Sequence, residues 1–452
     1  MQTYLVRTFG CQMNKHDSER VSGLLKASGL TPAVEPETAD VIVFMTCCVR
    51  EKADERLAGQ VASLKALKAV RPEALIAVGG CIGQRDGERL LEALPHVDVV
   101  FGTHNLSHLP ALLETAASER HSVVEVLDAT ENFTSDLPSE REHAWHAWVP
   151  IAVGCDNFCS YCVVPYVRGR ERSRRLEDII AECTGLADDG VLEVTLLGQN
   201  VNSYGRDLYG EPRFADVLRA VASTGIERIR FATSHPKDLS EATIRAIAET
   251  PEVMNALHLP VQSGSNRVLE AMNRGYTRER YLSLVDRLYD ALPSLALSTD
   301  VIVGFPGETS EDFEKTLDVV RRARYDQAFT FIYSPREGTP AAALAAQSAA
   351  AGDATPHEFI QARFDRLVGE VQRSALDKNR ALVGSTQRVL VEGPSRRDPH
   401  MLAGRCEGNK VVHVPVPSGR TAEQFAGTFA DVRITGAQTW FLTGELAGTN
   451  DL

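Results

Sequence analysis

Three cysteines lie close together in the segment GCDNFCSYC. They are Cys155, Cys159 and Cys162, and their spacing is C-x3-C-x2-C. The same spacing describes one face of a helix, but Gly154 is a poor residue for a helix interior and Pro165 follows closely. We therefore expect a loop that wraps around a metal centre.

The number of thiolates decides which metal centre fits this loop. Zinc and most iron-sulfur clusters take four ligands from the protein, whereas the loop offers three cysteines and no histidine. Zinc would need a fourth ligand from elsewhere, and it stays the competing interpretation. A four-iron, four-sulfur (4Fe-4S) cluster on three cysteines would keep one iron open, much as a catalytic zinc keeps an open position. The sequence favours such a cluster.

A second set of three cysteines follows predicted strands near the N-terminus. The strands are TYLVRTF, VIVFMT and LIAVGG, and the cysteines after them are Cys11, Cys47 and Cys81. Ligands of open α/β sheets bind at the carboxyl ends of the strands, so these cysteines can converge on one point. The alternative is that each is a small apolar residue closing a strand. Cys48 competes with Cys47, which we choose because it follows its strand directly.

Composition restricts the compartment and the partners. The 452 residues carry a net charge of −13, so nucleic acid can bind only at a local basic patch. No apolar run reaches the ~18 residues that a membrane helix needs, and the start MQTYLVRTFG lacks the apolar core of a signal peptide. We expect a cytoplasmic protein without a membrane segment. Its nine cysteines are then metal ligands, catalytic groups or core residues rather than disulfides.

The apolar pattern divides the chain into three predicted domains. Residues 1–128 alternate short apolar runs with helical patterns, which is typical of an open α/β domain with a parallel sheet. Residues 130–147 are polar and irregular and predict a linker. The alternation resumes within 141–376 and predicts a complete or partial βα barrel, with function at the loops after the strands. Short β runs within 378–447 predict a small all-β barrel.

The predicted elements can be stated as sequences. The barrel strands are expected at WVPIAV (148–153), LEVTLLG (192–198), RIRFATS (228–234), ALHLPVQSG (256–264), LALSTDVIVGFPG (295–307) and FTFIYSP (329–335). A helix is expected at 361–382. The last domain contains four predicted β runs, TQRVLVEG (386–393), KVVHVPV (410–416), FADVRITGA (429–437) and WFLTGEL (440–446).

The three-cysteine loop and its surroundings resemble the radical S-adenosylmethionine (SAM) enzymes. In that superfamily the loop follows the first barrel strand, SAM chelates the open iron, and an electron from the cluster splits SAM to a 5′-deoxyadenosyl radical. GQN, TSHP, HLPVQSGS, MNRGYT and DVIVGFPGET follow in order as barrel-edge motifs. The resemblance implies that Tyr161, Gln199, Gln262 and Arg274 bind SAM. A guanidinium such as that of Arg274 can hold a carboxylate in two places.

Two cysteine sets on one chain are similar to the methylthiotransferase family. Its members hold an auxiliary 4Fe-4S cluster on an N-terminal α/β domain and end in a small RNA-binding β-barrel, the TRAM domain. TFGCQMNKHDSE, CVVPYVRGRERSR and SPREGTPA resemble the branch that makes 2-methylthio-N6-isopentenyladenosine in tRNA. The implied fold is an open α/β domain, a partial (βα)6 radical SAM barrel and a TRAM barrel. Met45 departs from the asparagine that the family often has two residues before the second auxiliary ligand.

The family resemblance implies methylthiolation of C2 of N6-isopentenyladenosine at position 37 of tRNA. Two SAM molecules would be used per turnover: one methylates a sulfur on the auxiliary cluster, and the other yields the radical that opens C2. An aromatic C–H is too unreactive for side-chain acid or base catalysis, which agrees with a cofactor radical. The implied partners are a tRNA anticodon stem-loop, a reductant such as flavodoxin or ferredoxin, and a sulfur donor.

A local basic segment, VRGRERSRR, is the candidate for RNA contacts. Arg168, Arg170, Arg172 and Arg174 alternate, and an extended backbone would place them on one side, where they could bind anticodon-loop phosphates. Some of them could instead brace the cluster loop, and a solvated charged loop is the remaining alternative. The target base would have to be splayed out of the RNA to reach the radical.

Other functions stay open at this point. A methylthiotransferase for an aspartate of ribosomal protein S12, or one for threonylcarbamoyladenosine in tRNA, usually replaces the QM of GCQMN. A non-catalytic RNA-binding iron-sulfur sensor would leave the series of barrel motifs without a purpose. Cys48, Cys183 and Cys406 receive no role and are interpreted as core or surface thiols.

Overall fold

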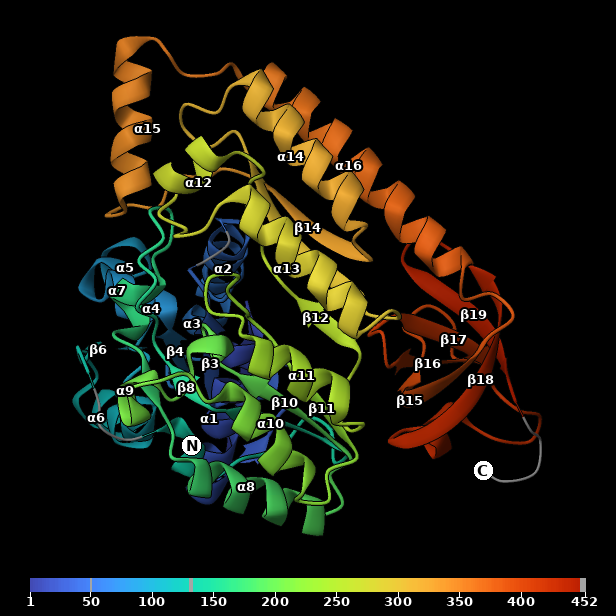
Figure 1. Ribbon diagram of the computed structural model, residues 1–452. Helices are drawn as coiled ribbons and strands as arrows, with labels where there is room; N and C mark the ends of the chain where they lie inside the picture. The colour runs from blue at the N-terminus through green and yellow to red at the C-terminus, as the bar shows by residue number, and fades with distance from the viewer. Residues whose placement is uncertain (49–50, 130–132, 448–452) are drawn as a thin grey trace.

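The computed structural model describes residues 1–48, 51–129 and 133–447. In Figure 1 the N-terminal elements, in blue and teal, lie against the green and yellow elements of the central part, and the red C-terminal barrel lies beyond the end of α16 (His357–Arg380). No helix of the described ranges is long and apolar enough to cross a membrane. The expected succession of a parallel α/β sheet, a partial βα barrel and a small closed β-barrel is confirmed.

The N-terminal sheet has six parallel strands in the order β2-β1-β3-β4-β5-β6. Their bounds are β1 Thr3–Thr8, β2 Thr31–Pro32, β3 Val41–Thr46, β4 Leu75–Gly80, β5 Val99–Phe101 and β6 Val123–Glu125. Every residue of β3 and β4 is buried, as expected for parallel strands covered on both faces. The helices are α1 Gln12–Ala27, α2 Glu51–Ser63, α3 Lys65–Val70, α4 Cys81–Asp86, α5 Glu88–Ala93 and α6 Leu109–Glu119.

Six parallel strands form the partial barrel, in two sheets of three with the orders β11-β10-β7 and β12-β13-β14. The bounds are β7 His146–Pro150, β10 Glu193–Leu197, β11 Arg228–Phe231, β12 Ala256–His258, β13 Ala296–Val303 and β14 Gln327–Ile332. A parallel bridge between Ile229 and Val253 links the two sheets, whose outer strands are β7 and β14. The longer helices are α8 Leu176–Asp188, α10 Phe214–Ala222, α11 Glu241–Glu249, α13 Arg278–Ala291 and α14 Ser310–Ala323.

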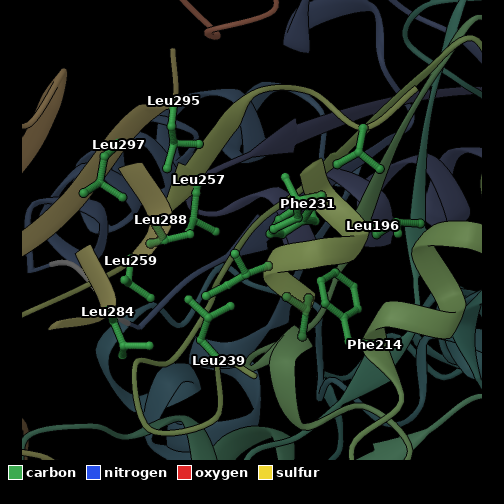
Figure 2. Packing of buried hydrophobic residues seen from close by; sticks show 14 of the residues in the cluster. Leu196, Phe214, Phe231, Leu239, Leu257, Leu259, Leu284, Leu288, Leu295 and Leu297 are labelled. Carbon is green, nitrogen blue, oxygen red and sulfur yellow. The ribbon is translucent and has the colours of Figure 1, made fainter. Parts of the chain in front are cut away.

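One apolar core runs through both halves of the partial barrel (Figure 2). Leu196 and Phe231 come from one sheet, Leu257 and Leu297 from the other, and Leu288 of α13 packs among them. The shorter elements lie over the strand ends. They are β8 Ala152–Val153, α7 Val164–Arg168, β9 Arg172–Ser173, α9 Arg206–Tyr209, α12 Asn266–Ala271 and α15 Pro340–Ala351.

The C-terminal barrel is closed in the order β15-β16-β17-β19-β18. Its strands are β15 Thr386–Pro394, β16 Met401–Cys406, β17 Val411–Pro415, β18 Thr428–Ala437 and β19 Phe441–Leu446. The sequence predicted four of these strands and missed β16. That strand buries alternate residues, but one of them is Gly404, which contributes no side chain to the apolar pattern.

From residue 133 on, the predicted linker is more ordered than expected, and its first three residues, 130–132, lie outside the described residues. Its end at residue 147 is wrong, because β7 begins at His146. The segment before it packs along α1: the guanidinium of Arg20 donates to the Leu137 carbonyl at 2.6 Å, and the Glu140 N–H donates to the Glu19 carbonyl at 3.0 Å. The connection therefore fixes the N-terminal sheet against the partial barrel.

A buried ion network joins the partial barrel to the C-terminal barrel. Asp326 accepts hydrogen bonds from the ammonium of Lys378 at 2.7 Å and from that of Lys410 at 2.6 Å. Lys410 belongs to the connection between β16 and β17, and its ammonium also donates to Asn379 of α16 at 2.7 Å. The carboxylate of Asp326 thus pairs with two ammonium groups, and these ion pairs hold the small barrel against the partial barrel.

We predict that Asp326→Ala loosens this docking. Asp326 is only 9% exposed, and its removal leaves two partly buried ammonium groups without their charge partner. Breaking a buried pair costs about 3 kcal/mol, which lowers the urea midpoint of unfolding. The control is Asp318→Ala, whose carboxylate is 46% exposed beside Arg278 and should contribute about 0.5 kcal/mol. Equal shifts for both variants would contradict the prediction.

Candidate functional site: two cysteine sets and the cavity beside them

The N-terminal cysteines lie at the carboxyl ends of three neighbouring strands. Cys11 follows β1 and is the residue before α1, Cys47 follows β3, and Cys81 begins α4 directly after β4. The thiols of Cys11 and Cys47 are hydrogen-bonded. Gly10 permits this approach, since a Cβ there would lie 2.2 Å from the Cβ of Cys47. Cys48 is fully buried in an apolar cluster and contacts Cys81, so Cys47 is the thiol of the pair that meets Cys11.

The electrostatic surroundings favour thiolates at this edge of the sheet. A hydrogen bond from Cys47, supported by the Arg168 charge, lowers the pKa of Cys11 to about 6. A hydrogen bond from Cys48, again supported by Arg168, lowers the pKa of Cys81 to about 7. Thiolates rather than thiols bind metals.

Thr46, next to Met45, holds the strand ends together beside the cysteines. Met45 is buried in the apolar core of the sheet. The hydroxyl of Thr46 donates to the Gly79 carbonyl at 2.6 Å and accepts from the Ile82 N–H at 3.3 Å. These bonds tie β3 to β4 beside the second and third cysteines.

The second cysteine set lies in the loop between β8 and α7. Its backbone is held by neighbouring segments: the Cys155 N–H donates to the Gly169 carbonyl at 3.2 Å, and the Ser160 N–H donates to the Met272 carbonyl at 3.0 Å. Burial raises the pKa of Cys155 to about 11 and that of Cys162 to about 12. These thiols give up their protons readily only when a metal replaces them.

Two of the predicted SAM-binding residues meet at this loop. Arg274 is buried and donates to the Cys159 sulfur at 3.3 Å and to the Tyr161 hydroxyl at 3.4 Å. The Arg274 guanidinium also donates to the Pro260 carbonyl at 3.0 Å. A guanidinium in this place can pair with a carboxylate brought in by a ligand.

The other two predicted residues lie on separate sides of the loop. The side-chain oxygen of Gln199 accepts from the Gly154 N–H and so positions the backbone before Cys155. Gln262 has a left-handed φ of 66° and forms a parallel bridge to Val301. Its side-chain oxygen is buried and has no hydrogen-bond partner within the described part of the chain, so it is available to a polar ligand.

Both cysteine sets fit an iron-sulfur cluster by the chemistry of their donors. Each offers three sulfur ligands, and each has a buried arginine beside it, Arg168 or Arg274. Among the residues that the structure describes, no three His, Cys, Asp or Glu side chains are arranged around a single point that could hold one metal ion. A four-iron cluster instead spreads its cysteines over different irons.

A cavity of about 550 Å³ begins at Cys11 and ends at the C-terminal barrel. Cys11 is accessible because it lines this cavity. The cavity wall includes residues from five barrel strands or their edges and from the connections of the small barrel. Examples are Thr195, Arg230, His258, Asp300, Phe329, Arg405, Lys410 and Trp440. Its size and mixed polar and apolar lining suit a nucleoside-sized ligand.

Known proteins share each part of this chain. The profile of the radical SAM superfamily matches residues 149–320, that of the uncharacterized protein family UPF0004 matches residues 3–102, and that of the TRAM domain matches residues 380–447. The tRNA-2-methylthio-N(6)-dimethylallyladenosine synthase of Acidothermus cellulolyticus is 51% identical over 426 residues, covering 93% of this chain and 84% of that protein. The chain belongs to this synthase family.

Further comparisons agree with the assignment. The synthase of the same name from Carboxydothermus hydrogenoformans is 46% identical over 448 residues, covering 98% of this chain and 99% of that protein. The radical SAM methyltransferase TsrM of Kitasatospora setae matches 77% of each chain with a TM-score of 0.56 and 16% identity, a likeness of fold alone. The family predicted from the motifs is confirmed, and it implies a 4Fe-4S cluster and SAM.

The prediction that an extended backbone places the four arginines on one side is wrong. Arg168 ends α7 and is buried, Gly169 turns the chain with a φ of 73°, and only Arg172 lies on a strand. Arg174 is buried, and its guanidinium donates to Glu182 of α8 at 2.6 Å. A helix and a turn therefore replace the extended backbone that alternation requires.

The two accessible members of this segment also have partners. Arg170 is 75% exposed and its guanidinium donates to Asp156 of the cluster loop at 2.7 Å. The guanidinium of Arg172 lies 5.1 Å from the centre of the Phe133 ring. Arg170 is therefore the most accessible of the four arginines for a phosphate. Arg168 and Arg174 are buried and form ion pairs inside the protein.

Sequence reasoning missed a group of buried polar atoms in the barrel. Asn200, Asn202, Ser234 and His235 each bury a side-chain nitrogen or oxygen that has no hydrogen-bond partner. Burial lowers the pKa of His235 well below its usual range. These residues belong to or follow the GQN and TSHP motifs, which was the available signal. Because such atoms are costly to leave unpaired, we infer that they face a ligand.

We predict that Gly154→Ala disrupts the cluster loop. Gly154 has a φ of 84°, and a Cβ there would lie 2.0 Å from the Arg170 carbonyl oxygen. Iron bound per chain after anaerobic reconstitution should fall. Gly169→Ala is the matched control, because its φ is 73° but no atom lies near its Cβ position, so only a cost of about 1 kcal/mol is expected. If Gly169→Ala lost more iron per chain than Gly154→Ala, this explanation would be refuted.

We predict that Cys11 is the first thiol of the metal-free protein to be alkylated near neutral pH. The thiolate is the reactive form, so iodoacetamide labelling should rise with pH through about 6. Cys162, with its pKa raised to about 12 by burial, should stay unlabelled at pH 7. Peptide mass spectrometry measures both. In Cys47→Ala the lost hydrogen bond should move the midpoint for Cys11 to higher pH, and an unchanged midpoint would contradict the assigned cause.

Proposed function

We propose that this chain methylthiolates C2 of N6-isopentenyladenosine at position 37 of tRNA. The names of its close relatives support the substrate. The observation that carries the proposal in the molecule itself is the cavity, because one partly open space is lined both by Cys11 and by residues of the module matched by the TRAM profile. A base splayed out of an RNA loop held at the small barrel could enter it.

The proposed roles follow from where the side chains lie. Cys155, Cys159 and Cys162 would hold the radical SAM cluster, and Cys11, Cys47 and Cys81 would hold an auxiliary 4Fe-4S cluster. When bound, SAM and the two clusters supply the radical that an aromatic C–H requires and the sulfur that replaces the hydrogen. Two SAM molecules per product would be needed, because one would supply the methyl group on that sulfur and the other would supply the radical.

The protein's own side chains then bind and orient. Arg274 would pair with the SAM carboxylate, with Tyr161 beside it, while Gln199 keeps the loop backbone in place. The unpartnered oxygen of Gln262 would accept a hydrogen bond from the ligand. A base bound in the cavity would lose part of its contact with bulk water, which would limit side reactions of a radical.

RNA binding would involve the small barrel and Arg170. Arg170 is accessible beside the cluster loop and would contact a phosphate. A tRNA substrate would place the reaction in the cytoplasm. A reductant such as flavodoxin or ferredoxin and a sulfur donor complete the proposed set of partners.

The proposal is tested by anaerobic reconstitution. Two 4Fe-4S clusters correspond to about eight irons per chain. The protein then receives dithionite, SAM and isopentenylated tRNA, and the digested RNA is examined for 2-methylthio-N6-isopentenyladenosine by mass spectrometry. About four irons would contradict the second cluster. Eight irons with 5′-deoxyadenosine but no modified nucleoside would refute the substrate, and ribosomal protein S12 would be tried next.

We predict that the two cysteine sets separate two activities. Cys155→Ala should abolish formation of 5′-deoxyadenosine, because it removes a ligand of the cluster that binds SAM. Cys81→Ala should keep some cleavage of SAM but lose methylthiolation. Cys183→Ala is the control, since Cys183 is equally buried but lies in the barrel core away from both sets. Equal loss of both products in the two ligand variants would argue against separate roles.

We predict that a large side chain in the cavity uncouples SAM cleavage from product. Gln327 of β14 is exposed and lines the cavity, so Gln327→Trp occupies space without overpacking the core. RNA methylthiolation should fall at least tenfold, a cost of about 1.4 kcal/mol, while 5′-deoxyadenosine is still formed. Gln347→Trp, at an exposed glutamine of α15 outside the cavity, should change neither. Unchanged methylthiolation in Gln327→Trp would contradict the proposed path.

A further inference from the structure

The short helix α7 belongs to one cysteine set in sequence and to the other in space. It begins two residues after Cys162 of the radical SAM loop. Its residue Val167, and Val163 just before it, pack in the apolar cluster of the N-terminal sheet that also contains Cys81. The hydroxyl of Thr103 donates to the Val167 carbonyl at 2.8 Å. The last residue of this helix, Arg168, is thereby carried to the auxiliary site.

Arg168 is fixed there by groups next to the auxiliary cysteines. It is 6% exposed, and its guanidinium donates to Asn14 at 3.1 Å and to Asp17 at 2.9 Å. Both partners lie in the first two turns of α1, which begins directly after Cys11. The charge of Arg168 acts on the auxiliary cysteines, because it helps to lower the pKa of both Cys81 and Cys11.

Arginines act on this group of cysteines: Arg168 on Cys11 and Cys81, and Arg85 on the neighbouring Cys48. Burial lowers the pKa of His16 and of His104, so both imidazoles are neutral at pH 7. The charged groups felt by Cys11 are Arg168 and Asp17. An arginine keeps its charge at any accessible pH, and charges act strongly in a buried, low-dielectric place.

We propose that Arg168 is a positioning residue that sets the reduction potential of the auxiliary cluster. This inference rests on the proposed second cluster. A fixed cation beside a sulfur ligand stabilises the reduced state, which carries one more electron, and so raises the potential. Hydrogen bonds and charge near the sulfur ligands are known means by which proteins adjust such clusters. Arg168 is the last residue of α7, and α7 directly follows the radical SAM loop. The position of that loop therefore affects the position of Arg168 at the auxiliary site.

The test measures the auxiliary cluster alone in the full chain. A background variant with Cys155→Ala, Cys159→Ala and Cys162→Ala is reconstituted anaerobically, and the electron paramagnetic resonance signal of the reduced cluster is followed during a dithionite titration with redox mediators. Arg168→Gln should lower the ratio of reduced to oxidised cluster at a given potential at least tenfold, which is 59 mV for a one-electron couple.

Three companion variants separate charge from shape. Arg168→Lys should keep most of the wild-type potential, since it keeps the charge. Asp17→Asn should shift the potential upward, because it removes the negative partner of Arg168. Arg170→Gln is the matched control, an exposed arginine two residues away that pairs with Asp156, and it should cause no shift.

Each outcome decides one claim. A background variant that binds no iron would refute the second cluster and therefore the proposed function. Iron-loaded Arg168→Gln with an unchanged potential would overturn the inference while leaving the function intact. A Lys variant that behaves like the Gln variant would also overturn it, because the effect would then be shape. If Arg168→Gln binds no iron, the Lys and Asp17→Asn variants decide by the direction of their shifts.

Discussion

Helix α1 buries an unusual run of charged and polar side chains between two folded units, and the arrangement of the molecule depends on how those charges are paired. The guanidinium of Arg20 donates to Glu182 at 3.0 Å, and Glu182 also accepts from Arg174 at 2.6 Å. One turn earlier in the helix, Asp17 accepts from Arg168 at 2.9 Å. An unpaired charge in such a place would cost several kcal/mol, so each ion requires its partner from across the boundary. The N-terminal sheet and the partial barrel therefore have one relative position in which all charges are satisfied.

In that position Arg168, which follows the second cysteine set in the chain, reaches Asn14 and Asp17 beside Cys11 of the first set. Each set lies where strands of a parallel sheet end, and in both cases glycine allows the backbone to approach, at Gly10 and at Gly154. Parallel strands place their following loops at one edge, which is why open α/β sheets and βα barrels both collect functional residues there. The cavity lies where the two units meet: residues 10–12 form one part of its wall, and strands of the partial barrel form another.

Much of this arrangement could be predicted from sequence, because long apolar runs and cysteine spacing are local signals. The strands Val41–Thr46 and Leu75–Gly80 have the predicted bounds, since both are buried on two faces and flanked by polar turns. Other features could not be read in this way. The alternation of arginines predicted an extended segment. Val167 of α7 and Val163 just before this helix pack in the apolar core instead, so tertiary packing overrode the local pattern. The unpartnered atoms of Asn202 and His235 became visible only once the backbone had buried them.

The cavity wall has a consequence for how the protein is made. Its last part comes from the connection between β16 and β17 and from Trp440, close to the end of the chain, whereas Cys11 is among the first residues synthesised. Domains generally fold as units during synthesis, the N-terminal ones first. Until the small barrel folds and Lys410 reaches Asp326, the space beside Cys11 is open on one side. In the growing chain Cys11 is therefore more accessible than in the finished protein, because the small barrel supplies part of the wall beside it.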